Sequence, residues 1–340
     1  MIPRKILIVK PSSLGDIVHS LPFLTAMKQR FPASGIHWVV AKGFEGLIED
    51  HPMIDKLWII HKDSWRKIEC AGSTVKEITS LFKDLKKEKF DLVIDLQGLL
   101  RSGLITAATD APVRIGFEEA REGSRLFYTQ TIKGGRDVHA VDRYLKVAEF
   151  LGCRSDDVCF HFPSSLNMAD IGGKFSLPKT YAVLVPGARW HTKRWPPEKF
   201  GELALRLPLE TVIVGGKGDI GMSDMIAALS QGKATSLAGK TSLKELIEIM
   251  RNAKFVISND SGPMHIAAAL GIPVFAIFGP TDPRRTGPYG KGNTIIREDV
   301  SCAPCFKKKC DDVKCMRSLS VERVYEAITV SLASSSPRGL

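Results

Sequence analysis

Residues 5–16 read KILIVKPSSLGD, and this stretch decides the fold of the first part of the chain. Lys5–Val9 is dominated by an unbroken apolar run, which is typical of a strand buried on both faces. The turn that follows contains Gly15 and Asp16, and a helical spacing of apolar residues begins directly afterwards, over Ile17–Arg30. A buried strand that passes through a short turn into a helix opens a βαβ unit, so the stretch predicts a parallel sheet.

The same alternation continues along the chain. In the first half we expect further strands at Ile36–Val40, Leu57–Ile60 and Leu92–Leu96, and an amphipathic helix with a basic end at Thr74–Lys89. The polar segment Pro163–Lys179 is rich in Gly, Ser and Pro, which indicates a linker. Beyond it the expected strands are Tyr181–Val185, Thr211–Val214, Phe255–Ser258 and Val274–Phe278, and the expected helices are Pro197–Arg206, Met222–Leu229, Leu243–Asn252, Ser261–Leu270 and Val321–Leu332. The predicted fold class is α/β, with two doubly wound, Rossmann-like domains that face each other across a cleft.

Length and composition define the broad class of protein. The chain has 340 residues, of which 44% are hydrophobic and 25% are charged, as in globular proteins of more than one domain. The longest apolar run, Ile266–Phe278, is interrupted by Gly271 and Pro273 and is shorter than the ~20 residues that span a bilayer. The apolar run near the N-terminus is too short for a signal peptide. We therefore expect a cytoplasmic protein without a spanning helix.

Charge and cysteine content limit the partners. The chain carries 48 basic and 37 acidic residues, a net charge of +11, which suits nucleic acid, an anionic membrane surface or acidic small substrates. Seven cysteines in a cytosolic chain argue against a disulfide framework. Four of them form the pattern Cys302-x2-Cys305-x4-Cys310-x4-Cys315 in a Lys-rich stretch. This pattern fits a four-thiolate metal site or ordinary reduced thiols in a loop, and we favour the second interpretation.

Ligands in open α/β sheets bind at the carboxyl ends of strands, and the first of these ends carries Asp16. Near the N-terminus of a helix the dipole favours the ionised carboxylate, which can then accept a proton. An ordinary helix N-cap is the alternative interpretation.

Two later strand ends suggest an anion site. Ser258-Asn-Asp-Ser-Gly-Pro-Met-His265 runs from a strand into a helix whose free N–H groups can bind phosphate. It matches neither the Rossmann glycine fingerprint nor the Walker loop, and His265 alone is more often a structural helix residue. The segment Val185–Pro196 adds Arg189, Lys193 and Arg194, for which a solvated basic loop is the alternative.

Five short motifs then occur in a fixed order over almost the whole chain. They are Lys10–Asp16, Asp95-Leu-Gln-Gly98, Lys193-Arg-Trp-Pro196, Asn259-Asp-Ser-Gly262 and Gly279-Pro-Thr-Asp-Pro283. With these motifs the sequence resembles the family 9 glycosyltransferases, the ADP-heptose:lipopolysaccharide heptosyltransferases. Ala120-Arg-Glu122 and His139-Ala-Val-Asp-Arg143 resemble the member that adds the first heptose to the Kdo sugars of lipid A.

The resemblance implies a GT-B fold with three parts. Residues 1–165 would form an acceptor-binding domain, residues 178–318 an ADP-sugar-binding domain, and residues 319–340 a final helix that packs back on the first domain. The implied reaction is an inverting transfer of heptose from ADP-L-glycero-D-manno-heptose to Kdo of Kdo2-lipid A. We expect it to proceed without a metal or other cofactor, on the cytoplasmic face of the inner membrane, with peripheral contact to anionic lipid and with no nucleic-acid partner.

Site residues follow from the resemblance by position. Asp16 corresponds to the general base, and Lys193 meets the donor diphosphate. The other donor-binding positions are Arg189, Asp219, Thr241, Asp260, Ser261, Gly262 and His265. A family member carries hydroxyls where this chain has Ala188 and Arg189, and Thr where this chain has Ser261, so the hydroxyl is kept only at the last position.

The departing ADP needs stabilisation, which a helix N-terminus and Lys193 can supply through dipoles and one fixed charge. No Asp-x-Asp pair follows a strand end in a metal-binding arrangement. Basic residues of the first domain are expected to face the Kdo carboxylates and lipid A phosphates, with solubility as the alternative reason for the lysines. They are His61, Lys62, Arg66, Lys67, Arg101 and Arg121.

Three other functions compete with this interpretation. A heptosyltransferase II-type or other family 9 enzyme would add a later core sugar. A nucleotide-linked epimerase or dehydrogenase is disfavoured by the missing glycine fingerprint. A basic nucleic-acid-binding protein with a four-cysteine metal cluster would show steep salt dependence of binding.

Overall fold

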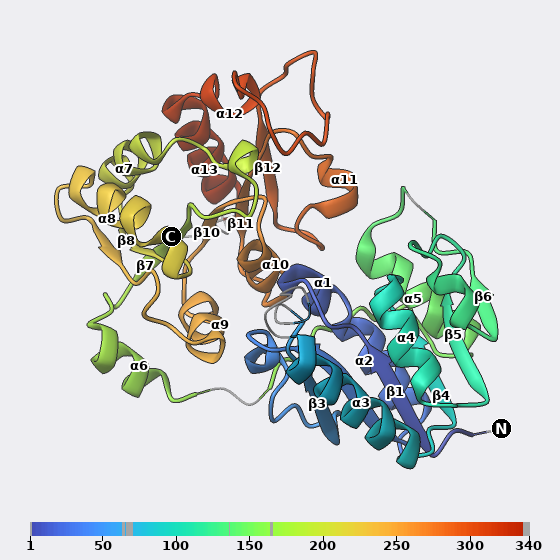
Figure 1. Cartoon of the computed structure of the whole chain (residues 1–340). Coiled ribbons are helices and arrows are strands. Elements are labelled where there is room, and N and C mark those ends of the chain that lie inside the picture. The colour runs from blue at the N-terminus through green and yellow to red at the C-terminus, as the bar shows by residue number, and fades with distance from the viewer. Residues whose placement is uncertain (1, 63–64, 66–70, 136, 164–165, 336–340) are drawn as a thin grey trace. The chain divides into compact units, whose positions relative to one another are not determined.

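The computed structural model describes residues 2–62, 65, 71–135, 137–163 and 166–335 (Figure 1). The chain divides into two compact units, Met1–Ser164 and Ser165–Leu340. In the described part of the chain no helix combines the length and apolarity needed to cross a membrane.

The first unit is built on a parallel six-stranded sheet in the order β3-β2-β1-β4-β5-β6. Its strands are β1 (Lys5–Val9), β2 (Gly35–Ala41), β3 (Lys56–Ile60), β4 (Leu92–Asp95), β5 (Val113–Phe117) and β6 (Gln130–Ile132). Its helices are α1 (Leu14–His19), α2 (Leu21–Arg30), α3 (Ala71–Lys87), α4 (Leu100–Ala108) and α5 (Ala140–Phe150), with 3-10 turns η1 (Glu45–Leu47) and η4 (Ser124–Phe127). Leu7 and Val9 of β1 pack with Leu85 of α3 and Ile105 of α4 on one face, while α2 packs with α5.

The predicted strands of this unit are confirmed, whereas the predicted helix Ile17–Arg30 is two helices. The division falls at Ser20, which ends α1 and whose Oγ donates to the carbonyl oxygen of Ile17 at 2.8 Å. Pro22 follows in the first turn of α2. Backbone N–H groups in a first turn have no intrahelical acceptor, so the missing N–H of proline costs no hydrogen bond there. Strands β5 and β6 and helices α4 and α5 were not predicted.

The second unit repeats the plan with the strand order β12-β11-β10-β7-β8-β9. Its strands are β7 (Tyr181–Val185), β8 (Glu210–Ile213), β9 (Ala234–Ser236), β10 (Val256–Asn259), β11 (Val274–Phe278) and β12 (Thr294–Arg297). Its helices are α6 (Met168–Phe175), α7 (Pro197–Arg206), α8 (Ile220–Leu229), α9 (Leu243–Arg251), α10 (Gly262–Ala269), α11 (Pro283–Thr286), α12 (Lys314–Arg317) and α13 (Val321–Ser335), with 3-10 turns η5 (His191–Lys193) and η6 (Lys217–Asp219). All four predicted strands are confirmed, and β9 and β12 are additional.

The segment predicted as a linker contains helix α6. Asn167 caps it by accepting a hydrogen bond from the N–H of Ala169 at 3.0 Å, and Ile171 is buried. Gly172 and Gly173 lower the helix propensity of this segment, and for this reason its composition did not predict a helix. The cap and the packing of the apolar side chain stabilise the helix nevertheless.

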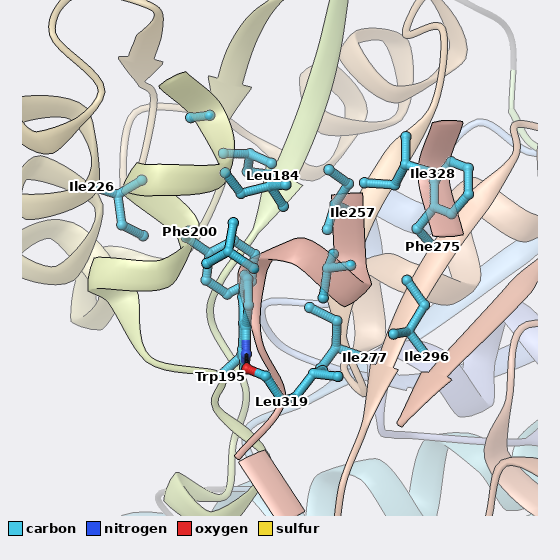
Figure 2. Close-up of a cluster of buried hydrophobic side chains, with 14 of the residues drawn as sticks. Leu184, Trp195, Phe200, Ile226, Ile257, Phe275, Ile277, Ile296, Leu319 and Ile328 are labelled. Atoms are coloured by element: carbon cyan, nitrogen blue, oxygen red, sulfur yellow. Dashed lines mark hydrogen bonds between the residues drawn. The ribbon is translucent and has the colours of Figure 1, made fainter. Parts of the chain in front are cut away.

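The last helix is buried in the hydrophobic core of the second unit, and its predicted packing on the first domain stays a prediction. Val321, Val324 and Ile328 of this part of the chain are buried in the second unit's hydrophobic core, which also contains Trp195 and Phe200. Figure 2 shows Ile328 beside Phe275 of β11. The indole N–H of Trp195 donates to the carbonyl oxygen of Leu319 at 3.0 Å, which fixes the chain just before α13. This apolar face therefore has its partner within its own unit.

Candidate active site

Asp16 lies at the carboxyl edge of the first sheet, in the first turn of α1. It is the third helical residue rather than the N-cap, which is Ser13. Its Oδ2 accepts hydrogen bonds from the backbone N–H of Ser13 at 2.8 Å and from the Ser13 hydroxyl at 2.7 Å. The Asp16 side chain is 38% exposed, so one carboxylate oxygen is oriented by Ser13 while the group keeps access to solvent.

Lys10 lies beside Asp16 and was not predicted to have a role of its own. It follows β1 directly and is only 2% exposed, and its Nζ is 3.9 Å from Asp16 Oδ1. The same Nζ donates to the carbonyl oxygen of Leu96 at 3.2 Å and lies 5.0 Å from the ring centre of Tyr144. Burial lowers the pKa of Lys10, although Asp16 and Asp95 oppose the change. A lysine placed directly after an apolar strand is the signal that could have identified it.

Tyr144 of α5 completes the surroundings of Asp16. Its hydroxyl donates to Asp16 Oδ1 at 3.4 Å, a long contact that comes from a helix 128 residues away in sequence. The segment His139–Arg143, quoted above for its resemblance, directly precedes it. The Oδ1 atom of Asp16 thus faces a buried lysine and a phenol, whereas Oδ2 faces Ser13.

Asp95, at the end of β4, has a structural role. It is fully buried, and its carboxylate accepts hydrogen bonds from the N–H groups of Gln97 and Gly98 and from the hydroxyls of Ser102 and Tyr128, at 2.6–3.0 Å. Burial raises the pKa of Asp95, and these hydrogen bonds oppose the rise. With four donors and no exposure, this carboxylate holds the Gln97–Gly98 turn and is no second candidate for a base.

The predicted acceptor residues follow other strands of the same sheet. His61 and Lys62 come after β3, and Arg121 comes after β5. The N–H of Arg121 donates to the carbonyl oxygen of Gly98 at 2.9 Å, which places this exposed residue at the Asp95-anchored turn. Arg101 of α4 donates to the carbonyl oxygen of Lys62 at 3.1 Å and so connects the segment after β3 to α4. Arg66 and Lys67 lie outside the described residues.

Lys193 and Asp260 form the centre of the predicted donor site, within the second unit. Lys193 Nζ lies 2.6 Å from Asp260 Oδ2, and the two side chains are 15% and 5% exposed. The hydroxyl of Thr281 donates to the same Asp260 oxygen at 2.6 Å. Lys193 Nζ also lies 4.6 Å from the ring centre of Trp190. Thr281, part of the Gly279–Pro283 motif, was not predicted as a site residue.

Asn259 fixes the loop that carries Lys193. It is fully buried at the end of β10, and its amide donates to the carbonyl oxygen of Pro186 at 2.7 Å. Its Oδ1 accepts from the N–H of Trp195 at 3.2 Å. Both ends of the loop between β7 and α7 are therefore tied to the residue that directly precedes Asp260.

Asp219 lies in the turn after β8 and is held against the end of β7. Its Oδ2 accepts from the N–H of Gly216 at 2.9 Å, and its Oδ1 is 3.9 Å from Nη2 of Arg194. A Cβ atom on Gly187 would stand 2.7 Å from Asp219 Oδ2, so only glycine allows this approach. The structure thus places Asp219 beside the loop that carries Lys193, and its role in donor binding stays a prediction.

The remaining donor positions also lie at the carboxyl edge of the second sheet. Ser261 is the N-cap of α10, Gly262 is its first residue, and His265 is buried in its first turns. The first N–H groups of a helix have no intrahelical acceptor, so the start of α10 offers donors to an anion. Thr241 is half-buried in the turn before α9, and Arg189 is exposed. Arg194 donates from Nε to the carbonyl oxygen of Ala188 at 2.8 Å, so it supports the loop.

Among the described residues, no group of three or more His, Cys, Asp or Glu side chains is arranged to hold a metal ion. The described side chains of the two candidate sites offer an accessible carboxylate in the first unit, and a lysine, a helix N-terminus and hydroxyls in the second.

Two parallel six-stranded sheets with helices, and polar residues gathered at their carboxyl edges, define a glycosyltransferase of the GT-B class. The chain belongs to glycosyltransferase family 9 (heptosyltransferase), whose family model matches residues 78–315.

Individual relatives agree with this assignment. The chain is 31% identical to lipopolysaccharide heptosyltransferase 1 of Pseudomonas aeruginosa over 323 residues, which cover 90% of this chain and 87% of the relative. A glycosyltransferase family 9 crystal structure from Veillonella parvula superposes with a TM-score of 0.82 at 26% identity, covering 98% of both chains. The E. coli heptosyltransferase WaaC with ADP-2-deoxy-2-fluoro heptose superposes with a TM-score of 0.75 at 28% identity, covering 96% of this chain and 99% of WaaC.

Proposed function

We propose that this chain transfers heptose from ADP-L-glycero-D-manno-heptose to a Kdo sugar of Kdo2-lipid A, with inversion at the anomeric carbon, in assembly of the lipopolysaccharide inner core. The observation that carries the proposal is the Asp16 carboxylate, oriented by Ser13 and accessible, in a member of the heptosyltransferase family. The relative from P. aeruginosa, named heptosyltransferase 1, and the WaaC complex with a fluorinated ADP-heptose support the choice of acceptor and donor.

Asp16 acts as the general base. It takes the proton of the Kdo hydroxyl as that oxygen attacks the anomeric carbon of heptose. The bond between the anomeric carbon and the diphosphate oxygen breaks on the opposite face, and its electron pair leaves with ADP. Ser13 orients the carboxylate, and the Nζ atom of buried Lys10 lies 3.9 Å from its other oxygen.

Lys193 and the start of α10 stabilise the departing ADP. An ammonium group has three N–H donors, of which one serves Asp260, so further donors remain for phosphate oxygens. Asp260 and the Trp190 ring hold the ammonium in place before the donor binds, which limits the reorganisation needed in the transition state. In this proposal the transfer step needs no metal ion.

The acceptor is a lipid, so the enzyme works at a membrane surface. We propose that it is cytoplasmic and binds the inner membrane peripherally. His61, Lys62, Arg121 and the undescribed Arg66 would bind the carboxylates and phosphates of the acceptor, since guanidinium groups match both anions. The net charge of +11 supports attraction to anionic lipid, which high salt should weaken.

Turnover with two acceptors tests the proposal. Purified protein is incubated with ADP-heptose and either Kdo2-lipid A or the same acceptor that already bears one heptose. We expect product only from the first acceptor, and β- versus α-linkage analysis of the product by NMR establishes inversion. Turnover of the second acceptor alone would assign the chain to a later step of the core, and turnover of neither would refute the proposed substrate pair.

A further inference from the structure

The loop between β12 and α12 (Figure 1) carries three consecutive exposed lysines, Lys307–Lys309. The Nζ atom of Lys308 lies 5.3 Å from the ring centre of Trp190. The Nζ atom of Lys193 lies 4.6 Å from the same ring centre. Because both distances are measured to one point, the two Nζ atoms are at most about 10 Å apart. Two ammonium groups that are distant in sequence thus lie at one indole ring.

A hydrogen bond ties the backbone next to Lys308 to the loop that carries Lys193. The hydroxyl of Thr192 donates to the carbonyl oxygen of Lys307 at 2.8 Å, and Thr192 itself is buried in η5. This single bond therefore joins the residue directly before Lys193 to the residue directly before Lys308. The two lysines are placed by one shared piece of structure rather than by the free motion of a surface loop.

The backbone of Phe306 is held in an unfavourable conformation two residues before Lys308. Its φ of 55° lies in the left-handed region, which a bulky aromatic residue rarely adopts. Its N–H donates to the carbonyl oxygen of Pro280 at 2.7 Å, and the guanidinium of Arg285 lies 5.5 Å from its ring centre. Such a conformation persists only where the surrounding contacts determine it, and it is concentrated at binding and active sites. The turn at Phe306 is therefore a built feature that positions the lysines after it.

The charges at this place leave room for an anion. The Lys193–Asp260 pair has no net charge, because its ammonium and carboxylate groups lie 2.6 Å apart. Among the described residues Lys308 forms no salt bridge, so its positive charge is not compensated within the chain. A departing nucleoside diphosphate carries several negative charges, which the neutral pair alone does not offset. An anion that contacts both ammonium groups would also relieve the repulsion between them.

We propose that Lys308 is a second binding residue for the diphosphate of the donor, held beside Lys193 at the Trp190 ring. This inference rests on the proposed function, since it takes the donor to be a nucleoside diphosphate sugar. A lysine has three N–H donors on a flexible stem, which suits a group whose charge is spread over several oxygens. Lys193 stays paired with Asp260, and Lys308 supplies the positive charge that this pair lacks.

The experiment measures the binding of ADP to the full-length chain by calorimetry, without acceptor. Lys308→Ala should weaken ADP binding about 5-fold, the upper range for a solvent-exposed pair of charges. Lys308→Arg keeps the charge and should restore most of the affinity. Lys309→Ala is the matched control, because it removes the same charge from the same exposed segment but not from the Trp190 ring. It should bind ADP as the natural chain does.

A double variant separates direct contact with phosphate from an effect that passes through Lys193. Lys193→Ala removes the ammonium group that Lys308 could influence across the Trp190 ring. If Lys308 contacts the diphosphate itself, adding Lys308→Ala to Lys193→Ala should weaken ADP binding by about 5-fold again. A residue that acts only by placing Lys193 would cause no further loss in this background.

The outcomes distinguish this inference from the proposed function. Equal ADP affinities of Lys308→Ala and Lys309→Ala would overturn the role of Lys308 and leave ADP as the donor nucleotide. The absence of any further loss in the double variant would overturn direct contact in the same way. A natural chain that does not bind ADP would instead refute the proposed donor, and the role of Lys308 with it.

Discussion

Replacement of Asp16 by Asn separates its catalytic role from its structural one. Asparagine keeps the size of the side chain, and its Oδ1 can still accept from Ser13. What it loses is the negative charge, and with it the ability to accept a proton at neutral pH. In the natural chain Ser13 donates two hydrogen bonds to a charged acceptor, each worth roughly 1.5–3 kcal/mol. In the variant the acceptor is neutral, and each bond is worth roughly 0.5–1.5 kcal/mol.

The expected cost in stability is therefore small. The half-exposed position and the 3.9 Å separation from Lys10 limit the ion-pair contribution to less than about 1 kcal/mol. Because water competes for the half-exposed carboxylate, only part of the difference between charged and neutral hydrogen bonds is lost. A total loss of about 1–2 kcal/mol lowers the melting temperature of a unit of this size by roughly 2–8 °C. Asp91→Asn is a matched control, because Asp91 Oδ2 also accepts two hydrogen bonds, from the N–H groups of Arg4 and Lys5 at 2.8 and 2.9 Å.

The expected cost in catalysis is much larger. General-base catalysis contributes about 10²–10⁴-fold, which corresponds to roughly 3–5 kcal/mol of transition-state stabilisation. Asp16→Asn should therefore bind ADP-heptose almost normally in calorimetry and transfer it about 10²–10⁴-fold more slowly, whereas Asp91→Asn should retain kcat. A variant with near-normal kcat would refute Asp16 as the base. Equal losses of stability and activity in both variants would assign Asp16 to folding alone.

The other predictions concern the donor, the metal, the acceptor and the pH dependence of stability. Lys193→Ala should raise the KM for ADP-heptose about 10–150-fold, as expected for a charge-assisted phosphate contact of roughly 1.5–3 kcal/mol, and unchanged donor kinetics would remove Lys193 from the site. EDTA should leave transfer intact in a discontinuous assay, and a complete loss that Mg²⁺ restores would contradict leaving-group stabilisation by Lys193 and α10. Arg121→Ala should raise the KM for Kdo2-lipid A more than that for the donor, whereas equal rises would place Arg121 elsewhere or indicate a folding defect. Hydrogen bonds from Lys5 and Lys56 lower the pKa of Glu88 from its usual 4.5 to about 2. The ionised form of Glu88 therefore stabilises the fold above pH 4.5, and this contribution is lost as the pH falls toward 2. Denaturant titrations of Glu88→Gln should accordingly differ from those of the natural chain at pH 7 by about 1 kcal/mol and converge near pH 2, and a constant difference would show that charge is not the cause.

The sequence by itself determined the order of strands and helices wherever apolar runs are long. Lys5–Val9, Tyr181–Val185 and Val274–Phe278 were predicted with the bounds that the structure has, because central parallel strands are buried on both faces and must be apolar throughout. Strands such as β6, with three residues, and β5, which contains Arg114 and Gly116, carry too little of this pattern to be recognised.

The sequence also determined which residues lie at the ligand-binding edge of each sheet. The carboxyl ends of parallel strands meet at one edge, so Asp16 after β1, Asp219 after β8 and Asp260 after β10 could be assigned to such edges from strand order alone. The roles proposed for them follow from the resemblance to the family.

Only the tertiary structure decided which polar groups pair with one another. The partners of Asp95 include Tyr128, and those of Asp260 include Lys193 and Thr281, all of them distant in sequence. Local periodicity contains no information about such pairs, so the structure alone shows that Asp95 is a buried anchor and that Lys193 is held by Asp260.

The same holds for α13, because an amphipathic helix reveals that it has an apolar face but not which unit buries it. Here Val324 and Ile328 pack on β11 and its neighbours, since that surface of the second sheet would otherwise expose its apolar side chains to water.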